Sequence, residues 1–386
     1  MSAKECTGAA RAPQPPPDPH GGNRLAAARR LGCRPEQLLD ASASLVPFGP
    51  PWSLKKRLLG LLLQGRALRD YPDRAYAELR QQLAGAHGLP ADGVLPGNGA
   101  AELFTWAARD AAAVGTSLLS TPGFGDYSRA LACWDARRHS LPLPLDWKQP
   151  GPAPWPLAQA AEAVTQRDGP TCLWITNPHN PTGQLWSRAS LEPLLQKHSL
   201  VIVDEAFLPL VPGGEQQSLI PLVARHPQLV VIRSLTKLLA VAGLRLGYAI
   251  GDPERLRRWA RWRDPWPVNG LAAALGPAVS ADPRWLARVH TWVQTEQAWL
   301  RSRLAAVDGL RARPSAANYL LLQGWRDDRP LSLEPLRQAL EQRHRILLRD
   351  CRSFEGLDDS WLRLSLLDRA GHQRFLRALE QEWPRR

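Results

Sequence analysis

Lys237 is the residue whose type most strongly suggests chemistry. It lies in "SLTKLLAVAGLRLGY", residues 234–248, and is one of only six lysines in a chain with 49 basic residues. Arginine supplies nearly all the positive charge, so a lysine at this position indicates a reaction that needs a primary amine. An amine forms an imine with an aldehyde, which a guanidinium cannot do. The alternative is an incidental surface lysine.

Two polar residues end apolar runs elsewhere in the chain. Asp204 closes "LVIVD", and a carboxylate buried there would be costly without a cation nearby. Asn180 lies in "TNPHNPTG", residues 176–183, and offers an amide at the end of another run. Each of them alone also fits an ordinary cap or turn.

A helix start and an aromatic residue add two further candidates. "LPGNGAAELFTWAARDA" runs from a short strand into a helix, which puts Asn98, Gly99 and Ala100 at the helix N-terminus. Free backbone N–H groups at such a position suit a phosphate, although Gly-Asn-Gly also makes ordinary turns. Phe124 in "STPGFGDY" follows another strand, and its ring serves either as core or as a stacking platform.

The elements that must position these residues are short strands separated by long connections. The predicted strands are apolar on both faces, as in a buried and mostly parallel sheet. They are "TSLLS" (116–120), "TCLWIT" (171–176), "LVIVDEAF" (200–207), "LVVIRS" (229–234) and "RLGYAIG" (245–251). An α/β sheet of this kind binds ligands at the carboxyl ends of its strands, where the candidate residues stand.

The chain divides into four predicted segments. Residues 1–19 are proline-rich and predicted to be a disordered tail, and residues 20–50 form an N-terminal arm that packs on the small domain. Residues 51–280 form the large domain. Residues 281–386 form a smaller α+β domain, with amphipathic helices followed by the strands "NYLLLQ", "RILLRD" and "WLRLSL".

Composition excludes several classes of protein. No segment has the length or apolarity of a membrane span or a secretory signal, and the cysteines form no CxxC pair, so neither zinc nor a disulfide framework is indicated. These features predict a cytoplasmic protein that holds no metal. The net charge of +13 comes from arginines spread along the whole chain, without a basic tail or a DNA-binding motif. The charge therefore favours anionic small molecules over nucleic acid.

Taken together, the candidate groups are those that pyridoxal phosphate requires. The chain resembles the fold-type I pyridoxal-phosphate enzymes of the class I/II aminotransferase superfamily over roughly residues 20–380, in the ordered motifs "YPD", "GNGAAEL", "NPHNPTG", "DEAF", "SLTK", "GLRLGY" and "WLRLS". The resemblance implies a large domain with a mostly parallel seven-stranded sheet. It also implies that Lys237 forms the imine with the cofactor, that Asp204 pairs with the pyridinium nitrogen, and that Ser234, Thr236 and Arg245 complete the phosphate shell.

The same resemblance implies roles for three more residues. Tyr71 of "DYPD" would reach the cofactor phosphate of a neighbouring subunit, which predicts a homodimer with shared sites. Arg363 of "WLRLS" would hold the substrate carboxylate, and Arg349 of "LLRD" would lie in the substrate pocket. Without the resemblance, each arginine would be read as a solvated surface residue.

Two branches of the superfamily compete. The threonine-phosphate decarboxylases of cobalamin biosynthesis carry an N-terminal "HGGN", which stands here at residues 20–23, and Phe207 in "DEAF" replaces the tyrosine usual in the aminotransferases. This branch converts O-phospho-L-threonine into (R)-1-aminopropan-2-yl phosphate and CO2, and gives His20 a substrate-side role. Ser44 and Val46 depart from the asparagines typical of both branches, which predicts an altered substrate side of the pocket.

Three alternatives stay open from sequence. The first is a histidinol-phosphate aminotransferase, which transfers an amino group to 2-oxoglutarate and shares the whole set of motifs. The second is that Asn23 of "HGGN" merely caps a helix. The third is another amino-acid-transforming enzyme. A pyridoxal-binding regulator is a hypothesis of another class, and it would need a DNA-binding domain, for which the sequence leaves no segment.

Overall fold

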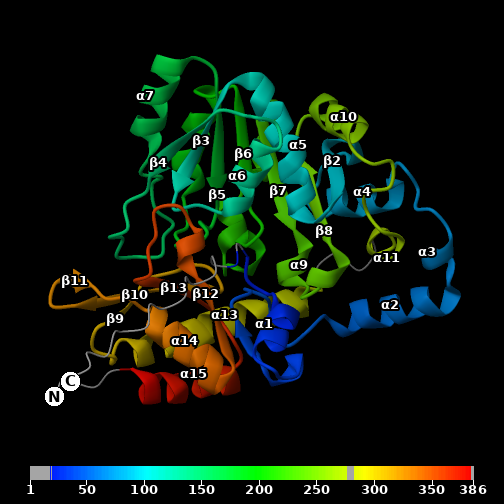
Figure 1. Cartoon of the computed structure of the whole chain (residues 1–386). Coiled ribbons are helices and arrows are strands. Elements are labelled where there is room, and N and C mark those ends of the chain that lie inside the picture. The colour runs from blue at the N-terminus through cyan, green and yellow to red at the C-terminus, as the bar shows by residue number, and fades with distance from the viewer. Residues whose placement is uncertain (1–17, 19, 276–281, 384–386) are drawn as a thin grey trace, which may run out of the picture.

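The computed structural model describes residues 18, 20–275 and 282–383. The predicted disordered tail, residues 1–19, therefore lies almost entirely outside the described residues. Two β-sheets organise the described chain, a larger one in the upper half of Figure 1 and a smaller one below it.

The larger sheet has seven strands, as the resemblance implied. Its spatial order is β2 (Val94–Asn98), β8 (Leu246–Ile250), β7 (Leu229–Ser234), β6 (Leu200–Asp204), β5 (Thr171–Thr176), β3 (Thr116–Thr121) and β4 (Arg138–Pro142). Strands β4, β3, β5, β6 and β7 pair in parallel, whereas β8 is antiparallel to both of its neighbours. The prediction of a mostly parallel sheet is confirmed.

Burial on both faces explains why most of these strands could be recognised. Every residue of β5 and of β7 is buried, and their bounds match the predicted runs. Successive side chains of β6 alternate between two cores: Val201 and Val203 join one, and Leu200 and Ile202 join the other. Strand β4 was missed because it is a partly exposed edge strand without an apolar run.

The predicted strand over residues 200–207 ends early, at Asp204. The backbone N–H of Ala206 donates to Asp204 Oδ1 over 2.9 Å, so the chain turns around its own carboxylate. This local bond takes the place of a ladder bond, and it fixes the carboxylate at the carboxyl end of β6.

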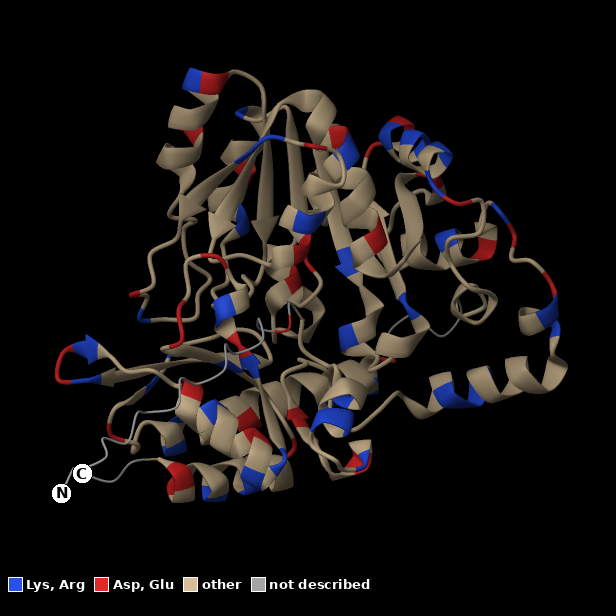
Figure 2. Ribbon diagram, viewed as in Figure 1, with Lys and Arg blue, Asp and Glu red and all other residues tan. Residues whose placement is uncertain are grey.

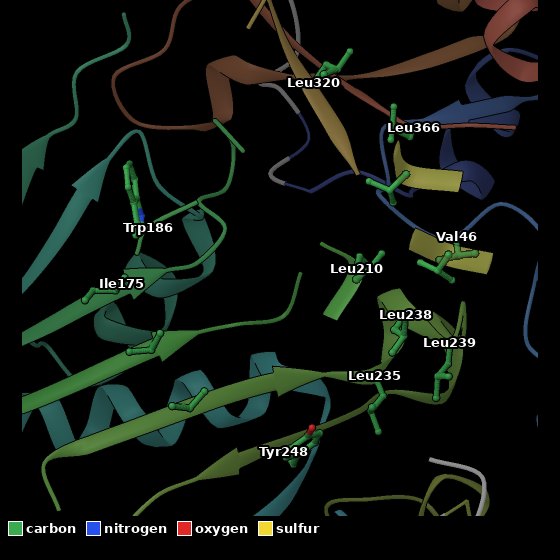
Figure 3. Close-up of a cluster of buried hydrophobic side chains, with 14 of the residues drawn as sticks. Val46, Ile175, Trp186, Leu210, Leu235, Leu238, Leu239, Tyr248, Leu320 and Leu366 are labelled. Carbon is green, nitrogen blue, oxygen red and sulfur yellow. The ribbon is translucent and has the colours of Figure 1, made fainter. Parts of the chain in front are cut away.

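Helices cover both faces of the large sheet (Figure 1). The helices in this part of the chain are α4 (Ala77–Gly85), α5 (Gly99–Val114), α6 (Gly125–Ala132), α7 (Ala158–Asp168), α8 (Arg188–Leu191), α9 (Leu235–Leu238), α10 (Pro253–Trp262) and α11 (Gly270–Ala273). Apolar side chains of α5, α6 and α10 pack together on one face of the sheet. Figure 3 shows part of the core on the opposite face, with Ile175, Trp186 and Tyr248 among its members.

The smaller sheet contains strands from both ends of the chain. Its order is β1 (Leu39–Ala41), β12 (Ile346–Asp350), β13 (Trp361–Ser365), β10 (Tyr319–Arg326) and β11 (Arg329–Pro330), and β9 (Leu310–Ala312) also pairs with β10. Its helices are α13 (Pro283–Leu304), α14 (Glu334–His344) and α15 (Arg369–Glu382). Strand β1 pairs in parallel with β12, so the N-terminal segment, residues 20–50, which includes α1 (Arg24–Arg30), supplies the edge strand of this sheet.

Helix α2 (Trp52–Gln64) extends away from the rest of the molecule and leads into α3 (Arg66–Arg69) (Figure 1). Its side chains Trp52, Leu59 and Leu63 are exposed, with Leu63 at 80%. In Figure 2 the helix carries one band of basic residues and is otherwise uncharged. Among the described helices, none combines the length and apolarity needed to cross a membrane.

Candidate active site

A cavity of about 300 Å³ lies where the carboxyl ends of the large sheet meet the N-terminal segment and the smaller sheet. Twelve of the predicted site residues line it. They are His20, Ala100, Phe124, Asn180, Asp204, Phe207, Ser234, Thr236, Lys237, Arg245, Arg349 and Arg363. Residues far apart in the sequence therefore meet in one small space, as expected for strand ends of an α/β sheet.

Asp204 is the buried carboxylate of the cavity. Its Oδ2 accepts a hydrogen bond of 2.5 Å from the Tyr127 hydroxyl, and its Oδ1 accepts from the backbone of Ala206. Burial raises its pKa to about 6, against the lowering effects of these two bonds and of the nearby Lys237 amine. The carboxylate is thus held in place, and the desolvation caused by burial outweighs the lowering effects of these bonds and of the Lys237 amine on its pKa.

Lys237 lies on the short helix α9, immediately after β7. Its neighbours Leu235 and Leu238 are buried in the core and hold the helix against the sheet (Figure 3). The Lys237 Nζ lies 5.6 Å from the centroid of the Phe207 ring. Desolvation, together with the charges of Arg363 and Arg245, lowers the pKa of Lys237 to about 8. Much more of the amine is therefore neutral at physiological pH than in an ordinary lysine.

The N-terminus of α5 forms an anion cradle. Gly99 has φ +76°, and a Cβ at this position would lie 2.6 Å from Arg245 Nη2, so only glycine lets the guanidinium approach the helix start. The buried hydroxyls of Ser234 and Thr236, which lie 2.7 Å apart, line the same cavity. Backbone N–H groups, a guanidinium and two hydroxyls are the donors that a phosphate needs.

The Phe124 ring is supported from several sides. It packs edge-on against Tyr127, with ring centroids 5.5 Å apart, and lies 5.8 Å from the His20 ring. Phe104 also lies edge-on to it. The ring is thus fixed in orientation while it lines the cavity, as a stacking platform requires.

Two arginines lie on the side of the small sheet. Arg363, which is buried, donates to Asn180 Oδ1 and, over 3.3 Å, to the Ser42 carbonyl. Arg349 donates to Ser353 Oγ over 2.7 Å. Burial lowers the pKa of Arg349 to about 10, with a further lowering by the positive charge of Arg363. Two close guanidinium groups in a small cavity attract anions.

The "HGGN" segment is built to approach the cavity closely. A Cβ on Gly21 would lie 2.2 Å from the Ser42 carbonyl oxygen, and Gly22 has φ +88°. Asn23 stands at the N-cap of α1 but makes no capping bond with its side chain, which donates to Asp18 Oδ2. Asn23 therefore stands at the cap position without capping through its side chain, while the glycines bring the segment against Ser42 and His20 into the cavity lining.

Several predicted residues lie elsewhere. The side chain of Asn98 is exposed and does not line the cavity, and its backbone N–H donates to Glu102 Oε2 over 2.9 Å at the helix start. Tyr71 is 78% exposed and stacks on Trp266, so it does not contribute to the cavity of its own subunit. Val46 packs in the hydrophobic core (Figure 3).

The prediction that Val46 alters the substrate side of the pocket is wrong, because its side chain packs in the core and does not line the cavity. Ser44 does line it, and its hydroxyl lies 2.8 Å from that of Ser365. Of the two departures from the family pattern, only Ser44 stands at the cavity.

Some residues that shape the cavity were not predicted from the sequence. Tyr127 was within the quoted "STPGFGDY" and carries the hydrogen bond to Asp204. Asp126 lines the cavity, and its buried Oδ2 has no hydrogen-bond partner among the described residues. Further lining residues that were not predicted are Gly21, Ser42, Ala43, Ala101, Phe104, Ala206 and Phe354. A tyrosine three residues after the platform aromatic was the one usable signal.

The family model for aminotransferase class I and II matches residues 39–379. The chain belongs to this family. It is a pyridoxal-phosphate-dependent enzyme. The residues of the cavity fit that cofactor, because they include a partly neutral amine, a buried carboxylate and an aromatic platform. They also include an anion cradle, which a Cβ on Gly99 would close. Its fold is that of the fold-type I enzymes.

Two curated relatives align along most of the chain. The threonine-phosphate decarboxylase of Salmonella typhimurium is 37% identical over 371 residues, which cover 93% of this chain and 95% of the relative. The histidinol-phosphate aminotransferase of Symbiobacterium thermophilum is 31% identical, covering 81% of this chain and 82% of the relative.

A solved structure shares the fold. The L-threonine-O-3-phosphate decarboxylase of Porphyromonas gingivalis has a TM-score of 0.75 at 24% identity, and the match covers 89% of this chain and 99% of the other. Both branches of the family therefore remain represented among the similar proteins.

Proposed function

We propose that the chain decarboxylates O-phospho-L-threonine to (R)-1-aminopropan-2-yl phosphate in cobalamin biosynthesis. The observation that carries the proposal is the N-terminal segment, whose His20 ring is a tilted neighbour of the Phe124 ring, 5.8 Å away, and lines the cavity. The 37% identity with a threonine-phosphate decarboxylase supports the same reading. Phe207 supports it as well, because its ring carries no hydroxyl for the cofactor's phenolic oxygen.

The substrate has two anionic groups, and the cavity has two arginines beyond the cofactor cradle. We assign the substrate carboxylate to Arg363, which Asn180 and the Ser42 carbonyl hold in place. Arg349 and His20 are then left for the substrate phosphate, on the side where the N-terminal segment lies; Arg349 also donates to the Asp18 carbonyl over 2.8 Å. An aminotransferase would also bind doubly anionic glutamate, so the arginines alone do not decide between the branches.

The residues divide the chemistry between them. We assign the cofactor phosphate to Ala100, Ser234, Thr236 and Arg245, the ring to Phe124, and the ring nitrogen to Asp204. Pyridoxal phosphate, when bound, accepts the electron pair left at the substrate α-carbon. The carboxylate leaves as CO2, and the Lys237 Nζ returns a proton to the same carbon. His20 and Arg349 orient the substrate so that the bond to the carboxylate, and not the bond to hydrogen, breaks.

Product analysis without a keto acid tests the proposal. With O-phospho-L-threonine alone, we expect many molecules of CO2 per active site and an amine product that keeps its nitrogen. His20→Ala should lower this turnover about tenfold or more, the effect of losing one bond to a charged group. The matched control is His226→Ala, at a histidine outside the cavity lining.

The second candidate function is amino transfer from histidinol phosphate, favoured by the 31% identity with such an aminotransferase. In that case phosphothreonine would release no CO2. Turnover would appear only when histidinol phosphate and 2-oxoglutarate are supplied together, and this result would replace the decarboxylase assignment.

We also propose that the enzyme is a homodimer with shared sites. The exposed apolar side chains of α2, including Leu59 and Leu63, and the exposed ring of Tyr71 are the surface that a second copy would cover. Tyr71→Phe keeps the ring stacked on Trp266 but removes the hydroxyl. We expect the dimer to persist and the dissociation constant for pyridoxal phosphate to rise about tenfold, because a bond to a charged phosphate is lost.

Light scattering measures the oligomeric state, and a cofactor titration separately measures the dissociation constant for pyridoxal phosphate. A fully active monomer would contradict the dimer, and an unchanged dissociation constant in a dimeric Tyr71→Phe enzyme would contradict the shared site. Leu63→Glu serves as the variant that should break the dimer itself, because it places a charge on the exposed apolar face of α2.

A further inference from the structure

An ion pair lies buried immediately beside the active-site strands. Arg233 Nη2 and Glu205 Oε2 are 2.6 Å apart, and their side chains are 2% and 0% exposed. Buried charges are expensive unless they are paired and fully hydrogen-bonded, so such a pair is retained only with a tight network around it.

The network around this pair is close to complete. Glu205 Oε1 accepts from the backbone of Leu219, and Oε2 accepts from the Ser218 hydroxyl, each over 2.8 Å. Arg233 also donates to both carboxylate oxygens of Glu215, over 2.7 and 2.9 Å. One guanidinium thus joins two carboxylates and the segment around Ser218.

The two charged residues stand next to the residues that form the cavity. Glu205 directly follows Asp204, and Arg233 directly precedes Ser234. Successive side chains of an extended strand point to opposite faces, so Arg233 points away from the cavity when Ser234 lines it. Asp204 pairs in register with Ile232, and the backbone N–H of Glu205 donates to the Ile232 carbonyl over 2.9 Å. The ion pair therefore joins the carboxyl ends of β6 and β7 where both deliver side chains to the site.

We propose that Glu205 and Arg233 are positioning residues that set the separation between Asp204 and the segment from Ser234 to Lys237. The pair also determines the net charge next to Asp204 on the side away from the cavity. The inference rests on the proposed roles of Asp204 and Lys237 toward the cofactor. It does not depend on whether the enzyme decarboxylates or transaminates its substrate.

The charges around the pair determine the sign of its effect. The Glu205 carboxylate raises the pKa of Asp204. Burial raises the pKa of Glu205 itself, and the positive charge of Arg233 opposes that rise. The other titratable groups that act on this pair are Glu215, His87 and Tyr248. Replacing Glu205 by a neutral residue removes the negative charge that raises the pKa of Asp204, so the pKa of Asp204 falls.

The test compares Glu205→Gln with Glu296→Gln in the cofactor-loaded enzyme. Glu296 is also a buried carboxylate, bonded to Arg369 and to His372, but it lies on α13 beside the small sheet. Both variants should lower the melting temperature. Only Glu205→Gln should raise the dissociation constant for pyridoxal phosphate about tenfold, equivalent to about one pKa unit. It should also move the pH midpoint of the visible cofactor band downward.

Arg233→Lys separates geometry from charge. It keeps the positive charge but loses the planar fork that bonds Glu205 and Glu215 together. We expect weaker cofactor binding with an unchanged pH midpoint, and this variant also answers the question if Glu205→Gln does not fold. The proposal is overturned if both Glu205→Gln and Glu296→Gln lower the melting temperature while cofactor affinity and midpoint stay at wild-type values. A wild-type enzyme without any visible band would instead refute the proposed cofactor site itself.

Discussion

Lys237→Ala should abolish turnover and remove the visible absorbance band of the cofactor-loaded enzyme. The amine is the group of the cavity that can join an aldehyde covalently, and its half-buried position on α9 directs it into the site. We expect a loss of at least about a thousandfold in turnover, or about 4 kcal/mol of barrier. Lys237→Arg should behave in the same way, because it keeps the charge and lacks the amine.

Lys197→Ala is the matched control for this prediction. Lys197 pairs with Glu162 on the surface, so its loss should leave band and turnover intact. A band that persists after desalting in Lys237→Ala, at wild-type intensity, would show that another group holds the cofactor.

The pH dependence of cofactor loading follows from the same amine. The amine attacks only in its neutral form, and the pKa of Lys237 is lowered to about 8. The neutral fraction at pH 7 is therefore about a tenth, against about one in three thousand for an ordinary lysine. We expect the loading rate to rise with pH up to about 8 and then level off, as stopped-flow absorbance would show.

Asp204→Asn should produce the second large effect. The substitution keeps the shape of the side chain but removes the negative charge that we assign to the cofactor's ring nitrogen. Each pKa unit lost at that nitrogen corresponds to about 1.4 kcal/mol. We expect turnover to fall by about three orders of magnitude, with the covalent link to Lys237 still formed.

Two further variants help to interpret the turnover of Asp204→Asn. Asp110→Asn is the control, because Asp110 is also buried in the large domain, where it accepts from Arg255 and from Trp259. It should lower stability without a comparable loss of turnover. Tyr127→Phe removes one hydrogen bond to Asp204 and should have an intermediate effect, about tenfold. Near-normal turnover in Asp204→Asn would make this carboxylate a structural residue only.

Much of the fold could be predicted because buried parallel strands leave a clear pattern. The runs at residues 171–176 and 229–234 are apolar on both faces, and both became strands with those bounds. The edge strand β4 left no such pattern. The antiparallel direction of β8 could not be predicted either, because an apolar run looks the same whether its strand is parallel or antiparallel to its neighbours.

The site residues divide in a similar way. Lys237 and Asp204 could be found because their types are unusual where they stand, an amine among arginines and a carboxylate at the end of an apolar strand. Glu205 and Arg233 gave no signal, since each follows or ends an apolar run like many charged residues. Only the pairing of β6 with β7 brings them to 2.6 Å.

By itself the sequence determined the chemistry, because imine formation and the charge at a ring nitrogen each demand one kind of side chain. The tertiary structure decided which of many arginines serve the site. The motifs of the family resemblance singled out Arg245, Arg349 and Arg363, which line the cavity, but without that resemblance each would be taken for a solvated surface residue. Their selection depends on which strand and helix ends meet at the cavity, and long-range packing alone sets that meeting point.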